Sequence, residues 1–389
     1  MIGSPDFDEL DYSWLRAKHG VKWQRPGPDL LPAWVADMDF PVAPPIRAAL
    51  GDVMERGDLG YPDWSERSPL AEPFARRMRE RYSWAARPDR VRDFSDLIQI
   101  LQVVLWLTTR PGDAVALHTP NYPPFLRTIT RMGRRTIACP FELSAQGWVF
   151  DPHRLERAVA RAGCRTLLLV NPHNPTGRVL TAEELHAVAD IVLRHDMLVI
   201  ADEIHADLTF PPHRHIPLAS LGPEIAERTV TVTSATKTFN IAGLRCAVAH
   251  IGPASLRDEL DEHPPDLFGA ANVLGVAATT AAWQHGDDWL AALLERLRAN
   301  RDMVASTLAR RVPAIEHRPP QATYLSWLDC RALGIEGEPA RYFRDRARVE
   351  LSPGSEFGDE GIGFARLNFA TSPNVLTEIL DRLATATHL

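Results

Sequence analysis

Lysine is nearly missing from this chain of 389 residues, since only Lys18, Lys22 and Lys237 occur among its 43 basic side chains. Almost every surface cation is therefore expected to be an arginine. A guanidinium stays protonated at any working pH and cannot form an imine, whereas a lysine amine can lose its proton and attack a carbonyl. Lys237 is therefore a candidate for amine chemistry, and the simpler alternative is a chance survivor on a solvated face.

Other absences narrow the class of protein. The four cysteines lie far apart, without a CxxC pair or a His/Cys cluster at metal-ligand spacing, so we expect reduced thiols, a cytoplasmic protein and no metal site. No segment resembles a signal peptide, and none approaches the ~18 uninterrupted apolar residues of a membrane span. The net charge of -7 is spread along the chain without a basic run, which argues against nucleic acid as a partner.

Helix-like and short apolar strand-like segments alternate from about residue 47 to 270. This rhythm predicts an α/β fold whose large domain, residues 47–270, contains a mostly parallel sheet flanked by helices. Longer helices follow, so residues 1–46 and 271–389 are expected to form an N-terminal arm and a small α+β domain. The expected strands are Ala114–His118, Thr166–Val170, Leu198–Ala201, Thr229–Thr233 and Cys246–Ile251, and the expected long helices are Val273–His285 and Trp289–Arg311.

Lys237 stands in a string suited to a phosphate-bearing aldehyde. Ser234 precedes it by three residues, directly after an expected strand, and Arg245 follows it by eight. Ser234 can donate to a phosphate oxygen, Arg245 can bind the dianion through its fork of donors, and Lys237 can reach the aldehyde carbon as a Schiff base. An SxxK motif alone also occurs in serine hydrolases, so the specificity comes from the longer string.

Further polar and aromatic side chains follow other expected strands. Asp202 could hold a pyridine nitrogen protonated, or cap a helix. Asn174 lies between two Asn-Pro steps and could donate to a phenolate oxygen, or serve only the turn. Tyr122 could cover the ring, although a place in the core is as reasonable. Arg366 suits bidentate capture of a substrate carboxylate, and a surface salt bridge is its alternative.

Together these residues resemble the fold-type I pyridoxal-phosphate (PLP) enzymes of the aspartate aminotransferase superfamily. Within it they are similar to the MalY/PatB-like cystathionine β-lyase (C–S lyase) branch. The strings that carry the resemblance run through nearly the whole chain and are Trp34–Pro41, Gly60–Pro62, Thr119–Phe125, Asp202–His205 and Lys237–Leu244. The resemblance implies the PLP-transferase fold type I.

The resemblance also implies PLP as the cofactor and Lys237, Asp202 and Tyr122 as the catalytic residues. The substrate would contact Arg366, Ala36 and Asn174. The implied cofactor contacts are Lys237, Asp202, Asn174, Tyr122, His205, Ser234, Arg245, Leu97, Ile98 and Tyr61, the last reaching the phosphate of the neighbouring subunit. A homodimer with shared active sites follows from this use of Tyr61. His205 stands where aminotransferases of the superfamily usually have a tyrosine, which favours the lyase branch.

Two departures from the family concern the phosphate end. The family usually has a glycine-containing turn before the helix that cups the phosphate, and the corresponding stretch here is Phe94–Gln99. Asp96 would place a negative charge beside a dianion unless it points away. Many lyases of this branch lack an arginine at position 245, and Arg245 could compensate for Asp96 electrostatically.

The resemblance implies a carbon–sulfur β-lyase that cleaves cystathionine or another S-substituted cysteine to a thiol, pyruvate and ammonia. Lys237 would take the Cα proton, and the thiolate would leave without much further acid catalysis. The alternative is an aminotransferase or decarboxylating deaminase acting on a cysteine conjugate in secondary, antibiotic metabolism. A regulatory PLP-binding protein is a rival of another class, but the catalytic set is complete.

Overall fold

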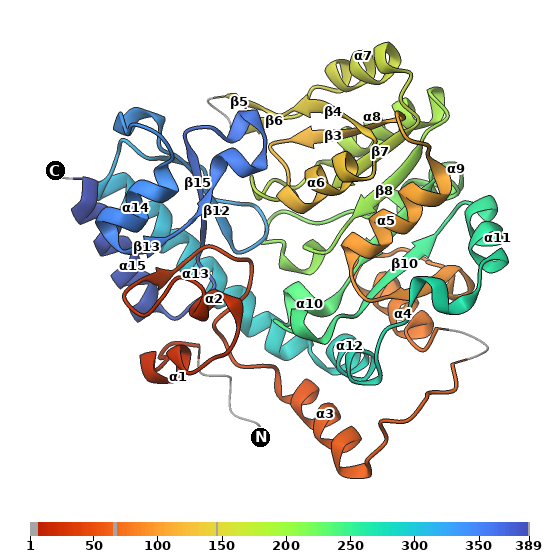
Figure 1. The fold of residues 1–389 in the computed structure, drawn as a ribbon, viewed down its shortest axis with the longest axis horizontal. Coiled ribbons are helices and arrows are strands. Elements are labelled where there is room, and N and C mark those ends of the chain that lie inside the picture. Colours follow the sequence, from red (N-terminus) through yellow and green to blue (C-terminus); the bar gives the residue numbers. More distant parts are fainter. Residues whose placement is uncertain (1–6, 65–67, 145–146, 388–389) are drawn as a thin grey trace.

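The computed structural model describes residues 7–64, 68–144 and 147–387 (Figure 1). Its central element is a seven-stranded sheet with the strand order β2-β10-β9-β8-β7-β3-β4. Five neighbouring strands are parallel, and β10 runs antiparallel to both β2 and β9. The mostly parallel α/β sheet is thus confirmed. Its strands are β2 (Val91–Phe94), β3 (Ala114–Thr119), β4 (Arg135–Pro140), β7 (Thr166–Val170), β8 (Leu198–Asp202), β9 (Thr229–Thr233) and β10 (Ala247–Ile251).

Helices cover both faces of this sheet, which explains why its strands are apolar at successive positions. In β7, Leu167 and Leu169 pack into a cluster with the helices of one face, while Leu168 and Val170 pack into the cluster of the other. The first face carries α7 (Pro152–Ala162), α8 (Ala182–Arg194) and α9 (Pro223–Ala226). The second carries α5 (Leu97–Thr108), α6 (Pro123–Arg131) and α11 (Ala254–Glu262).

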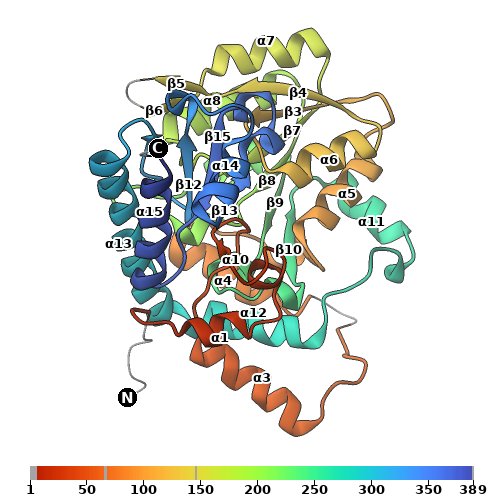
Figure 2. The ribbon, with the colours of Figure 1, turned by 60° about the vertical axis from the view of Figure 1, so that its left-hand side comes forward.

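The C-terminal part builds a separate four-stranded sheet of order β11-β12-β15-β14. The long helix α13 contacts α15, and α14 contacts α15 as well, so these helices lie side by side along the blue end of the chain (Figure 2). The elements are α13 (Asp287–Arg311), β11 (Glu316–His317), β12 (Leu325–Asp329), α14 (Pro339–Ala347), β14 (Ser352–Pro353), β15 (Phe364–Asn368) and α15 (Pro373–Thr387).

The N-terminal segment crosses to this C-terminal part. Strand β1 (Leu31–Pro32) pairs in parallel with β13 (Val349–Glu350). The chain then returns to pack α3 (Pro44–Arg56) and α4 (Ala71–Tyr82) against α12 (Val273–His285). The remaining short elements are α1 (Tyr12–Arg16), α2 (Val21–Gln24), β5 (Glu142–Ser144), β6 (Gly147–Val149) and α10 (Ala235–Thr238). The division into domains at residues 46 and 270 stays a prediction.

All four cysteines are free and buried. Within the described ranges, no helix combines the length and apolar character needed to cross a membrane. Nor do the described side chains include a group of three or more His, Cys, Asp and Glu that could hold a metal ion.

Candidate active site

One edge of the seven-stranded sheet gathers the loops that carry the predicted site residues. Parallel strands β3, β7, β8 and β9 all end at this edge. Strand β10 runs antiparallel to β9, so β10 begins at this edge. Strand β2 runs antiparallel to β10, so β2 ends there. Side chains before β10 and after the other strands therefore converge, as ligand-binding groups do in open α/β sheets.

A cavity of about 170 Å³ lies at this edge. All but two of the predicted site residues line it, namely Ala36, Leu97, Ile98, Tyr122, Asn174, Asp202, His205, Ser234, Lys237 and Arg245. Arg366 lies directly behind Asn174, to which its guanidinium donates a hydrogen bond of 3.0 Å. Tyr61 is fully exposed and does not line this cavity.

Lys237 enters the cavity from the four-residue helix α10, directly after β9. Its Nζ donates to the carbonyl oxygen of Ala36 at 2.7 Å and lies 3.7 Å from the carboxylate of Asp37. Burial lowers the pKa of Lys237, and the nearby Asp37 opposes that shift. A lysine with a depressed pKa has a larger neutral fraction, which is the form that condenses with an aldehyde.

Asp202 ends β8 with its carboxyl group buried in the cavity wall. One oxygen accepts a hydrogen bond from the backbone of Ile204 at 3.0 Å, and no described cation forms an ion pair with it. Burial, with a contribution from Glu203, raises the pKa of Asp202 to about 7. A buried carboxyl group without a counter-charge is costly to ionise. A protonated pyridine nitrogen beside Asp202 would supply the missing positive charge.

Arg366 is buried on β15 and is held in a fixed orientation. Its guanidinium donates to Asn174, to the carbonyl oxygen of Trp34 at 3.0 Å and to the hydroxyl of Ser352 at 3.1 Å. Its Nε is buried without a partner in the described part of the chain. Burial lowers the pKa of Arg366 to about 10, so the side chain stays cationic at neutral pH. A buried cation with an unused donor is suited to an entering carboxylate.

His205 and Tyr122 complete the walls. Burial, together with the charges of Lys237 and Arg366, lowers the pKa of His205 to about 3, so the imidazole is neutral. Its Nδ1 has no partner among the described atoms, which leaves it available to a ligand. Tyr122 directly precedes α6, where burial raises the pKa of its hydroxyl and keeps it protonated.

The end of the cavity predicted to hold a phosphate contains Asp96 and Arg245. Asp96 caps α5 by accepting a 2.9 Å hydrogen bond from the backbone of Gln99, and its second oxygen forms an ion pair with Arg245. Arg245 therefore offsets the negative charge of Asp96, as the sequence suggested it could. Ser234 lies 2.6 Å from the carbonyl oxygen of Cys246, so its hydroxyl is already engaged.

Sequence reasoning missed two residues beside Lys237. Asp37 was part of a recognised string, but its charge was given no role, although it is the carboxylate nearest to the lysine amine. Tyr324 donates at 2.8 Å to the same carbonyl oxygen of Ala36 that Lys237 contacts. Only the Trp34–Pro41 string pointed toward Asp37, and no sequence signal pointed to Tyr324, which comes from the C-terminal part.

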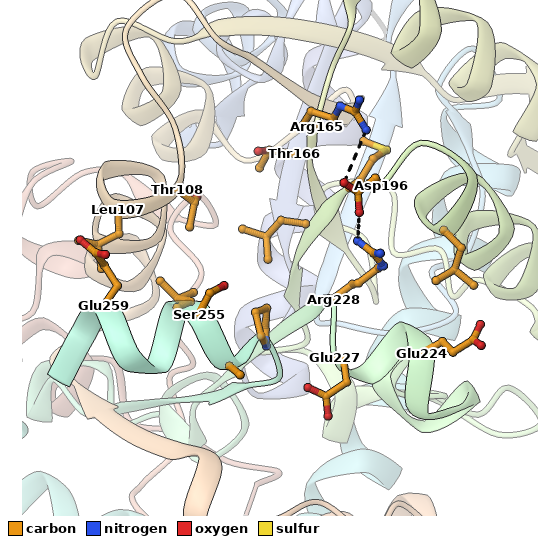
Figure 3. A pocket seen from close by; sticks show the side chains of 16 residues that line it. Leu107, Thr108, Arg165, Thr166, Asp196, Glu224, Glu227, Arg228, Ser255 and Glu259 are labelled. Carbon is orange, nitrogen blue, oxygen red and sulfur yellow. Dashed lines mark hydrogen bonds and ion pairs between the residues drawn. The ribbon is translucent and has the colours of Figure 1, made fainter. Parts of the chain in front are cut away.

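A larger cavity of about 1280 Å³ lies where β7 and β8 begin, at the opposite edge of the sheet (Figure 3). Three of its charged side chains form one cluster, since Asp196 pairs with both Arg165 and Arg228. None of the predicted site residues lines it. Size alone therefore does not mark the active site of this protein.

The smaller cavity fits PLP. An unpaired buried carboxyl group and a lysine amine with a lowered pKa line it, and the start of α5 stands at one end beside the ion pair of Arg245 and Asp96. These are the groups that PLP sites provide for the pyridine nitrogen, the aldehyde and the phosphate.

Comparisons with known proteins agree with this arrangement. The family described as Aminotransferase class I and II matches residues 35–383. The chain is 32% identical to cystathionine beta-lyase PatB of Bacillus subtilis, covering 94% of this chain and 96% of that protein. It is also 32% identical to a cystathionine beta-lyase of Corynebacterium glutamicum, covering 97% and 99%. The crystal structure of cystalysin from Treponema denticola, which contains a pyridoxal 5′-phosphate cofactor, is similar with a TM-score of 0.92, 29% identity and 98% of both chains covered.

Proposed function

The chain belongs to the aminotransferase class I and II family, and we propose that it is a carbon–sulfur β-lyase that cleaves cystathionine or a related S-substituted cysteine. Its cofactor is PLP, as in the similar solved structures. The proposal rests above all on one observation, that Lys237 and the unpaired Asp202 line a single cavity with Asn174, which the buried Arg366 contacts from behind. The names of the full-length relatives from two organisms support the choice of substrate.

When bound, PLP supplies an aldehyde for the amine of Lys237 and a ring that withdraws electrons from the substrate Cα. Arg366 binds the substrate carboxylate and, with Asn174, fixes the orientation of Cα. The amine of Lys237 would take the Cα proton. Asp202 would stabilise a positive charge on the ring nitrogen at a buried position. A thiolate leaves Cβ readily, so the cavity needs no strong acid beside the sulfur.

Two features favour elimination over transamination. A thiolate bound to Cβ is a better leaving group than the groups found on ordinary amino acids. In addition, His205 is neutral and stands where the superfamily's aminotransferases usually place a tyrosine. Transamination and decarboxylating deamination are the alternative reactions that the test below must distinguish from elimination.

The test is to supply PLP and cystathionine to the purified protein, and to measure pyruvate with lactate dehydrogenase and thiol with a disulfide dye. We expect equal amounts of both products, and no turnover by the variant Lys237→Ala. Absence of pyruvate from cystathionine and from a panel of S-alkyl cysteines would refute the proposal. Accumulation of pyridoxamine phosphate or of an aldehyde product would assign the alternative reactions.

We also propose a homodimer in which the partner subunit's Tyr61 reaches the phosphate end of each cavity. The support is an exposed apolar surface at the end of α3 and just after it, where Met54 is 57%, Leu59 51% and Tyr61 fully exposed. Exposed apolar surface of this kind is found at protein–protein interfaces, which supports the proposal.

We also propose that the protein is cytoplasmic, and the buried free cysteines support a reducing compartment.

The dimer is tested by mixing two inactive variants, Tyr61→Ala and Lys237→Ala, under conditions that exchange subunits. If Tyr61 acts across the interface, each mixed dimer has one site without any substitution, so lyase activity returns on mixing. If Tyr61 acts within its own chain, every site keeps a defect and the mixture stays inactive. Light scattering after size-exclusion chromatography measures the subunit number independently.

A further inference from the structure

All three lysines of the chain touch one short segment, residues 36–39. Lys237 donates to the carbonyl oxygen of Ala36 at 2.7 Å. Lys22 donates to the carbonyl oxygen of Asp37 at 3.1 Å. Lys18 donates to the carbonyl oxygen of Asp39 at 2.6 Å. In a chain so poor in lysine, two further amines thus contact the same short segment as the catalytic one.

A second cavity, of about 310 Å³, adjoins this segment. Its wall includes Lys18, Lys22, Asp37, Asp39 and Ala242. The first cavity also has Ala242 in its wall, together with Ala36. The two cavities are therefore neighbours, because they share Ala242 and are lined by the consecutive residues Ala36 and Asp37.

The charges of the second cavity fall into two groups. Lys22 and Asp39 form a buried ion pair with a separation of 3.0 Å, and Trp23 donates to the same carboxylate at 2.7 Å. These two charges neutralise each other within the protein. They leave one cation and one anion, Lys18 and Asp37, to face the cavity.

Among the residues that the structure describes, Lys18 forms no ion pair, and Asp37 forms one with Lys237. The Nζ of Lys18 meets a carbonyl oxygen and lies 3.9 Å from the ring centre of Trp14. Asp37 lies 3.7 Å from the amine of Lys237, but that amine has to be neutral when it takes the Cα proton. A ligand that carries both a carboxylate and an ammonium would complement the pair.

We propose that the second cavity binds the distal amino-acid end of the substrate, with Lys18 contacting its carboxylate and Asp37 its ammonium group. This inference rests on the proposed function and deepens it. It selects thioethers that join two amino acids, such as cystathionine, over cysteines with an uncharged S-substituent. The same two residues would then determine specificity rather than perform the bond cleavage.

Four substrates separate the two contacts. Cystathionine carries both distal charges, S-(2-carboxyethyl)cysteine only the carboxylate, S-(2-aminoethyl)cysteine only the ammonium, and S-ethylcysteine neither. The variant Lys18→Met should lower kcat/KM for the two distal carboxylates, relative to S-ethylcysteine, by about tenfold or more. The variant Asp37→Asn should lower kcat/KM in the same way for the two substrates with a distal ammonium group, cystathionine and S-(2-aminoethyl)cysteine. The control Arg16→Met also removes a cation that donates to a backbone carbonyl in this region, and should leave the ratios unchanged.

Binding can be read without turnover, because so few lysines are present. Protein labelled with [ε-13C]lysine and carrying Lys237→Ala should give two signals, which Lys18→Met assigns. Cystathionine should shift the Lys18 signal, and S-ethylcysteine should not. The inference is overturned if Lys18→Met changes all four substrates equally or none, or if cystathionine leaves the signal in place. Failure of the proposed function would look different, since no substrate would then yield pyruvate while the Lys18 signal still responds.

Discussion

Replacing Asp202 by asparagine should make the cofactor-free protein more stable at alkaline pH. The carboxyl group is buried, pairs with no described cation and has a pKa raised to about 7 from 3.8. A group whose pKa is raised by folding contributes stability that is fully present below its unfolded pKa and is lost as the pH rises through the folded value. Asparagine has the shape of the neutral acid and can still accept the hydrogen bond from Ile204.

The size of the effect follows from the shift in pKa. About three pKa units correspond to roughly 4 kcal/mol over the whole titration. The difference in free energy of unfolding between the Asp202→Asn variant and the parent protein should therefore shift by roughly 2–3 kcal/mol in favour of the variant from pH 5 to pH 8. All other titrating groups are common to the two proteins, so they cancel in this difference.

The assay is urea unfolding of both cofactor-free proteins at pH 5, 6, 7 and 8. Adding PLP should reverse the order, because the ring nitrogen supplies the missing cation to Asp202 and stabilises only the parent protein strongly. A difference that stays constant from pH 5 to pH 8 would show that the carboxyl group is not held neutral by burial. The interpretation of Asp202 as a site awaiting a cation would then be wrong.

Three further predictions concern other parts of the chain. Arg366→Lys should lower kcat/KM for cystathionine about 10- to 100-fold, since an ammonium cannot reproduce the forked contact; unchanged steady-state kinetics would contradict this. Gly252→Ala should lower the free energy of unfolding by about 3 kcal/mol, because the added Cβ would lie 1.7 Å from a backbone oxygen. Gly51 in α3 has open space around it, so Gly51→Ala should raise the free energy of unfolding by ~0.5–1 kcal/mol. Urea unfolding measures both changes. Burial lowers the pKa of Lys18 to about 8, so the preference for cystathionine over S-ethylcysteine should fall between pH 7 and pH 9, and a flat ratio of kcat/KM would refute this.

The sequence predicted the sheet well because strand and loop chemistry are local. Two strands, Thr166–Val170 and Thr229–Thr233, have the expected bounds, and Asp202 directly ends a third. Residues placed just after such strands, among them Lys237 and Asn174, could be expected to meet because parallel strands end at one edge. These parts of the site required no knowledge of packing.

The remainder of the site depends on contacts between distant segments. Tyr324 and Arg366 come from the C-terminal part, and their positions follow from how the second sheet packs, which no local pattern specifies. The electrostatic role of Asp96 was open for the same reason. Only the fold shows that Arg245 lies within ion-pair distance of it.

The stretch from Trp34 to Phe40 is held mainly through its backbone. Asn240 binds the N–H and carbonyl of Met38, and Asn368 binds the carbonyls of Val35 and Asp37. Hydrogen bonds to the backbone do not depend on which side chains the stretch carries. A substitution at an outward-facing position of this stretch can therefore change what the cavity presents to a ligand while these backbone contacts remain.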